Sequence, residues 1–163
     1  MTASPVHVRE IVAVLDHETR LASELHQALL SQRAAVASAD GPRVNDSVDA
    51  VGRALHMLDA ARRQRTALLE RLDGRTLADF ATTAEPNDRA ELEAARARLR
   101  GVAEDVTRAA GINRQVLRRS MEAGEAFLQE LFASVGGPAA CYRPDENPDA
   151  GRQSAGVLLN RTA

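Results

Sequence analysis

The apolar residues in the first part of the chain recur at alternating steps of three and four. The stripe contains Val8, Ile11, Leu15, Ala22, Leu25, Leu29 and Val36, with Glu18 and Gln32 as its two polar members. A repeat of 3.5 residues keeps one side of a helix facing a neighbouring helix. The pattern therefore predicts a long helix from about Val8 that packs in the manner of a coiled coil. We expect Gly41-Pro42 to end this helix.

A second stretch with the same spacing runs from about Asn45 to Leu72. Its stripe contains Val48, Val51, Leu55, Leu58, Leu69 and Leu72. Arg62 and Arg65 fall on this stripe, and we expect their aliphatic stems to lie along the contact while the guanidinium groups reach water. Asp73-Gly74 provides a stop signal for the helix.

Thr76 is suited to cap one or two helical turns, and Pro86 is suited to begin a third long helix that runs to about Ser134. The stripe of that helix contains Leu92, Leu99, Val102, Val106, Asn113, Val116, Ser120, Phe127 and Leu131. Gly101, Gly111 and Gly124 interrupt it, and glycine permits either a close helix approach or a local bend.

These patterns predict an all-α fold, an elongated antiparallel bundle of about three long helices with coiled-coil-like packing. The aromatic content of 2% fits a core of Leu, Val and Ala, which suits helices. We expect residues 1–135 to form the bundle. Residues 136–163 are rich in Pro, Gly, Asp and Asn and show no period, so they predict a flexible C-terminal tail. Within that tail, Val157-Leu158-Leu159 is an apolar cluster that docks either on the parent fold or on a partner.

The composition argues against most other classes of function. A net charge of −2 does not favour nucleic-acid binding, and no apolar run reaches the length needed for membrane insertion. The N-terminal segment does not resemble a signal peptide, so we expect a cytoplasmic protein. The single cysteine and the four histidines match no metal-binding or catalytic motif. We therefore predict no enzyme activity, no catalytic residue, no metal site and no cofactor.

Two segments, LDAARRQRTALLERLDGRTLADF and INRQVLRRSMEAGEAFLQEL, are followed by Tyr142 in the polar tail. In this order they resemble the FlgN family of flagellar export chaperones. Arg65 with Leu68-Leu69 matches an R-x-x-L-L pattern. Asn113, Leu117 and Ser120 match an N-x-x-N-type segment followed by Leu and Ser, in which Val116 replaces the second Asn. Tyr142 matches a tail tyrosine, with Pro144 after it, although the expected glycine comes only at Gly151.

The resemblance implies a cytoplasmic chaperone that binds the terminal helical segments of hook–filament junction proteins and prevents their premature assembly. It also implies delivery of these clients to the flagellar export gate and the export ATPase complex, with no cofactor and no reaction. The alternative is a generic coiled-coil adaptor or structural subunit unrelated to secretion. The sequence leaves open whether the chain is a monomer or a homodimer.

A client's amphipathic helix needs apolar residues at helical spacing on the chaperone. Met121, Phe127, Leu128, Leu131 and Phe132 supply such a set, with Met121 as the adaptable member. They are either a partner-binding surface or the core at the end of the bundle. Asn113 is either a further partner contact or a buried amide that fixes helix register. The candidate partner-binding residues are Asn113, Met121, Phe127, Leu128, Leu131, Phe132, Tyr142, Val157, Leu158 and Leu159.

Overall fold

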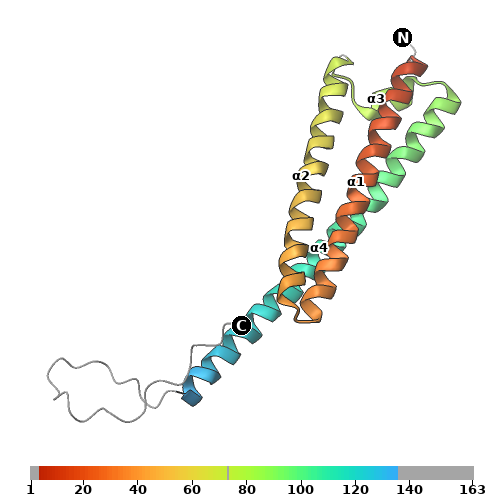
Figure 1. Cartoon of the computed structure of the whole chain (residues 1–163). Helices are drawn as coiled ribbons and strands as arrows, with labels where there is room; N and C mark the ends of the chain where they lie inside the picture. Colours follow the sequence, from red (N-terminus) through yellow and green to blue (C-terminus); the bar gives the residue numbers. More distant parts are fainter. Residues whose placement is uncertain (1–3, 73, 136–163) are drawn as a thin grey trace, which may run out of the picture. The chain divides into compact units, whose positions relative to one another are not determined.

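The structure is a computed structural model that describes residues 4–72 and 74–135. The described residues form four helices and no strand, which confirms the all-α prediction (Figure 1). The helices are α1 (Pro5–Ala37), α2 (Gly41–Arg71), α3 (Leu77–Thr83) and α4 (Pro86–Val135). The chain divides into two compact units, residues 1–124 and 125–163. The predicted tail, with Tyr142 and the cluster Val157-Leu158-Leu159, lies outside the described residues.

The stripe predicted for the first helix is buried in α1. Apart from the half-buried Val36, every member of the stripe is buried, and this includes the polar Glu18 and Gln32. Val12, Leu21 and Ala35 are buried as well and widen the stripe. A wider apolar face is needed because α1 contacts α2, α3 and α4 through the two hydrophobic clusters of the first unit.

Helices α1 and α2 form an antiparallel hairpin joined by a short turn (Figure 1). Ala39 in the turn has a left-handed backbone, with φ of 52°. Asp40 caps α2 by accepting a hydrogen bond from the Arg43 amide at 3.2 Å. The second helix thus begins at Gly41, earlier than the predicted Asn45, because Pro42 is tolerated within the first turn of a helix.

The stripe predicted for α2 is only partly buried. Leu58 is buried and Val51, Leu69 and Leu72 are half-buried, as expected. Val48 and Leu55 are each 51% exposed, so their assignment to the core was wrong. The buried positions near them are Ser47 and Ala61. These small side chains let α2 lie close to α1, and the larger Val48 and Leu55 then fall at the edge of the contact.

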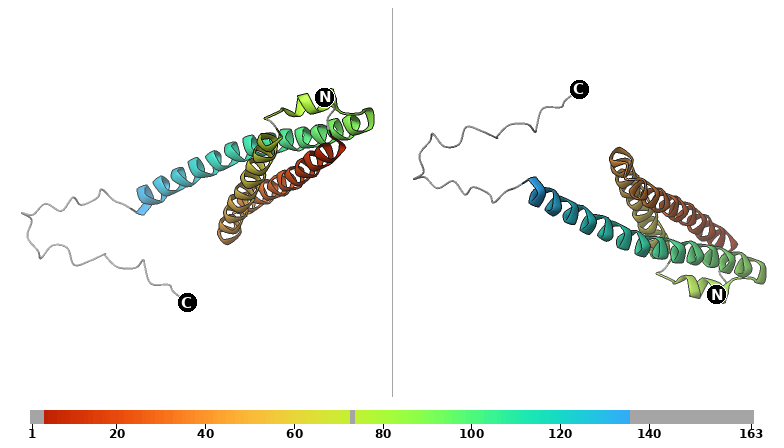
Figure 2. Two further views of the ribbon diagram at one scale, coloured as in Figure 1. Left: turned by 90° about the horizontal axis from the view of Figure 1, so that it is seen from above. Right: turned by 90° about the horizontal axis from the view of Figure 1, so that it is seen from below.

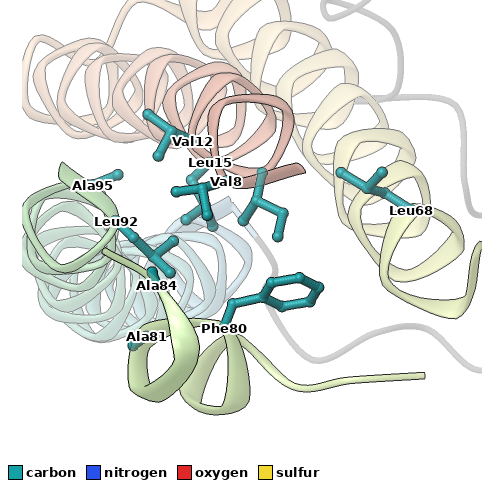
Figure 3. Close-up of a cluster of buried hydrophobic side chains, with 10 residues drawn as sticks. Val8, Val12, Leu15, Leu68, Phe80, Ala81, Ala84, Leu92 and Ala95 are labelled. Atoms are coloured by element: carbon teal, nitrogen blue, oxygen red, sulfur yellow. The ribbon is translucent and has the colours of Figure 1, made fainter. Parts of the chain in front are cut away.

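Helix α3 closes one end of the core of the first unit. As predicted, Thr76 caps it, and the cap is reciprocal: the Thr76 hydroxyl accepts from the Asp79 amide, while the Asp79 carboxylate accepts from the Thr76 amide at 2.8 Å. The hydrogen bond from the Thr76 hydroxyl holds the pKa of Asp79 below its ordinary value. Figure 3 shows Phe80 pointing from α3 into the cluster that contains Val8 and Leu68. Phe80 is almost fully buried, and the Arg75 guanidinium lies 4.5 Å from the centre of its ring.

The first part of α4 lies beside α1 (Figure 2). Helix α4 begins at Pro86, as predicted. The predicted stripe is buried or half-buried from Leu92 to Val116, while Ser120 is exposed. An ion pair between Arg98 and Asp16, at 2.7 Å, joins α4 to α1. Among the described residues, a Cβ atom at Gly101, Gly111 or Gly124 would meet nothing within 4 Å, so none of these glycines serves a close approach to another described segment.

Candidate functional site

The end of α4 carries large apolar side chains that the described part of the chain does not cover. In the second unit, Phe127, Leu128, Leu131 and Phe132 are 64%, 49%, 43% and 73% exposed. Met121, at the end of the first unit, is also exposed. The sequence allowed these residues to be either the core of the bundle or a surface. In the described residues their side chains are exposed, so they form a surface.

These residues share one side of the helix. Phe127 and Leu131 are four residues apart, as are Leu128 and Phe132, so the two pairs form adjacent ridges. Met121 precedes Leu128 by one heptad and lies on the same ridge. Ala126 lies on the opposite side. The end of α4 is therefore an amphipathic segment with an unpartnered apolar side.

Asn113 occupies a different environment from the exposed residues. It is buried, and its amide nitrogen donates to the Leu29 carbonyl at 2.7 Å and to Oε1 of Gln32 at 3.0 Å. Its Oδ1 atom accepts no hydrogen bond within the described residues. This is the register-fixing role that the sequence offered for Asn113, because α4 must keep one position along α1 to keep both bonds. In this arrangement Asn113 contacts α1 and presents little surface to a partner.

A second buried polar group joins α1 to α2. Glu18 is 3% exposed and lies 3.6 Å from Nε of Arg62 and 3.2 Å from Nε of Arg65, whose side chains are 57% and 29% exposed. The sequence placed Glu18, Arg62 and Arg65 on facing stripes, but it assigned the guanidinium groups to water. In the structure these groups reach the buried carboxylate, because Glu18 is charged and has been removed from water.

The three residues also line a groove in the first unit, with a volume of about 520 Å³. Its floor is apolar and includes Leu15, Leu58, Leu99 and Val106. Its polar lining consists of Glu18, Arg62, Arg65, Arg96, Arg100 and Thr107. Sequence reasoning missed this groove because its lining comes from four segments, α1, α2, α3 and α4. The recurrence of Arg96 and Arg100 at helical spacing was the available signal.

Two classes of site are not found in the described part of the chain. No group of three His, Cys, Asp or Glu side chains among residues 4–72 and 74–135 is placed to hold a metal ion. Among the same residues, no helix combines the length and the apolarity that crossing a bilayer requires.

Comparison with known proteins gives one match. A family model described as FlgN protein matches residues 1–150. No curated protein and no solved structure matches the chain. The match covers both segments that carried the resemblance, the four described helices and the exposed end of α4. The chain therefore belongs to the FlgN protein family, and this membership supports a general role as a flagellar export chaperone.

Proposed function

We propose that this protein binds the terminal helical segments of hook–filament junction proteins in the cytoplasm and keeps them from assembling before export. The observation that carries the proposal is the exposed apolar side of α4, formed by Phe127, Leu128, Leu131 and Phe132. A helix with an unpartnered apolar side suits the capture of another amphipathic helix. The chaperone would then deliver the client to the export gate and the ATPase complex, without a cofactor or a reaction.

The energetics of such a complex are modest. Full burial of a large apolar side chain contributes about 1.5–3 kcal/mol. Since the four side chains are already partly covered by their own helix, their further burial contributes somewhat less than this. Association costs at least about 4 kcal/mol, and a micromolar complex needs about −8 kcal/mol net. The α4 surface alone is therefore marginal, and further contacts are needed.

We propose that the segment from Cys141 to Leu159 supplies those further contacts, with Tyr142 and Val157-Leu158-Leu159 as the contact residues. Ordering of this segment on the client or on the export gate would add apolar area. Truncation of the chain after Gly137 tests this assignment. We expect the truncated chain to bind client peptides at least tenfold more weakly, and an unchanged affinity would remove the segment from the proposal.

The α4 surface is tested with Leu128→Asp and its matched control Ala126→Asp. Both substitutions add one carboxylate to an exposed position of the same helix, but Ala126 lies on the opposite side. Calorimetric titration with C-terminal helical peptides of junction proteins should show at least about a tenfold loss of affinity for Leu128→Asp, since a buried apolar contact is lost. Equal affinities for the two variants would overturn the assignment of this surface.

The same titration addresses the alternative of a structural subunit. A chaperone is stable alone and binds its client reversibly. A structural subunit with a permanent partner depends on that partner for its stability. A reversible calorimetric signal with a folded, isolated chain therefore supports the chaperone, and membership of the FlgN family favours it as well.

A further inference from the structure

The groove of the first unit is strongly basic for its size. Arg62, Arg65, Arg96 and Arg100 line it, against the single carboxylate of Glu18. Arg62 and Arg65 already face Glu18, and Arg96 pairs with Glu93 of its own helix at 2.8 Å. Arg100 forms no ion pair within the described residues. The groove therefore presents a positive rim above an apolar floor, which favours an occupant with apolar and acidic sides.

The edge of the groove on α2 offers further uncovered apolar area. Val48, Leu55 and Arg62 follow one another at intervals of one heptad, so they lie along one line of α2. Arg62 lines the groove, while Val48 and Leu55 are half exposed. The sequence pattern predicted both residues to be covered by a helix. The described residues contain no helix that covers them, so the space beside this line of α2 is open to a helix from another molecule.

The chemistry that matches this groove is present at the end of α4. Residues 121–135 contain Glu122, Glu125 and Glu130 and no basic residue. Their apolar side is exposed, and Glu125 lies beside it. The segment is thus an acidic amphipathic helix, and the groove is an apolar trough with a basic rim.

We propose that the end of α4 of one copy docks in the groove of a second copy of this chain. The apolar side of the segment would cover the groove floor, and Glu125, which lies beside that side, would face the rim formed by Arg96 and Arg100. Each copy has one segment and one groove, so the contact joins two different surfaces. Such a contact either closes as a reciprocal dimer or continues from copy to copy, and both are self-association through the same pair of surfaces.

This contact has a consequence for the chaperone. The exposed apolar residues of α4 would be covered by a second copy until a client displaces it. Only this competition depends on the proposed function, because the self-association itself needs no client. A chaperone without a client would thereby keep its apolar α4 surface covered by a second copy. A client would displace that copy when its concentration and affinity are high enough, because the two compete for the same surface.

The test uses the full chain with two charge reversals, Arg100→Glu in the groove and Glu125→Arg on the α4 segment. Sedimentation equilibrium should show self-association of the unmodified chain with a dissociation constant on the order of 1–100 µM. Each variant alone should associate about fivefold or more weakly, since each turns an attraction into a repulsion. An equimolar mixture of the two variants should associate like the unmodified chain. In a mixed pair, one contact joins Glu125 of the Arg100→Glu variant to Arg100 of the Glu125→Arg variant. In the other contact both charges are reversed, so the two positions still attract each other.

The controls are Arg53→Glu and Glu130→Arg, which change the same charges at exposed positions of α2 and of the opposite side of α4. Neither should change the association. A chain that stays monomeric up to about 1 mM would overturn the proposal. The proposal would also be overturned if Arg100→Glu weakens the self-association and the mixture does not restore it. The groove would then bind an acidic ligand other than the α4 segment. If the mixture restores association but client peptides do not compete with it, the docking stands and the proposed client surface fails.

Discussion

The ion pairs of Glu18 predict that substituting the carboxylate and substituting its arginine partners have different effects on the free energy of unfolding. Glu18 is buried, whereas its partners Arg62 and Arg65 are partly exposed. Replacing both arginines by methionine keeps most of the aliphatic volume and leaves a buried carboxylate without a positive partner. Removing one side of a buried ion pair in this way costs about 3–5 kcal/mol. Glu18→Leu instead leaves two arginines that water can solvate, so we expect its cost to be within about 1 kcal/mol.

Urea denaturation followed by circular dichroism at the helical band measures these effects. The double variant Arg62→Met/Arg65→Met should lose about 3–5 kcal/mol, which is a large part of the 5–15 kcal/mol that stabilises a typical domain. The triple variant with Glu18→Leu should recover most of that loss, because the buried charge is gone. The urea dependence of the free energy of unfolding should be unchanged. If Glu18→Leu costs as much as the double variant, or if the triple variant recovers nothing, the carboxylate is not held by its arginines and the reasoning is wrong.

The remaining predictions concern stability and are checked by thermal or urea denaturation. Phe80→Ala should cost about 3–5 kcal/mol, since the ring is almost fully buried where α3 meets α1 and α2. Thr76→Ala should cost about 0.5–2 kcal/mol by removing the cap of α3. Asn113→Ala should cost about 1–3 kcal/mol, because it leaves the Leu29 carbonyl and Gln32 without their buried donor. Gly101→Ala and Gly111→Ala should each add up to about 1 kcal/mol, since a Cβ at either position has open space around it. A loss of stability at either glycine would show that its Cα does need a close approach.

The helices themselves could be predicted from the sequence. The stripe of α1 is long and one-sided, and even its polar members Glu18 and Gln32 lie where the period places them. Thr76 and Pro86 begin α3 and α4 as their chemistry requires. These features are local, so a single sequence contains the information needed to place them.

The side of a helix that is covered could not be predicted in the same way. Val48 and Leu55 have the period of a buried stripe, but they lie at the edge of the contact because Ser47 and Ala61 face α1 instead. The residues Phe127 and Leu131 likewise continue the stripe of α4 beyond the point where it is buried. Periodicity reports that a side is apolar, whereas burial depends on which neighbour reaches it. The groove with Arg96 and Arg100 was missed for the same reason, since it exists only once distant segments come together.

The short turn between α1 and α2 has a consequence for the order in which the protein folds. Only Ser38, Ala39 and Asp40 separate the two helices, so bringing the helices together closes a short loop and costs little conformational entropy. The contact between Asn113 and Leu29, by comparison, joins residues that are 84 positions apart. We expect the α1–α2 hairpin to form first, and to form on the ribosome before α4 has been synthesised, because nearby contacts are reached fastest. Newly made α4 would then find its docking surface already assembled.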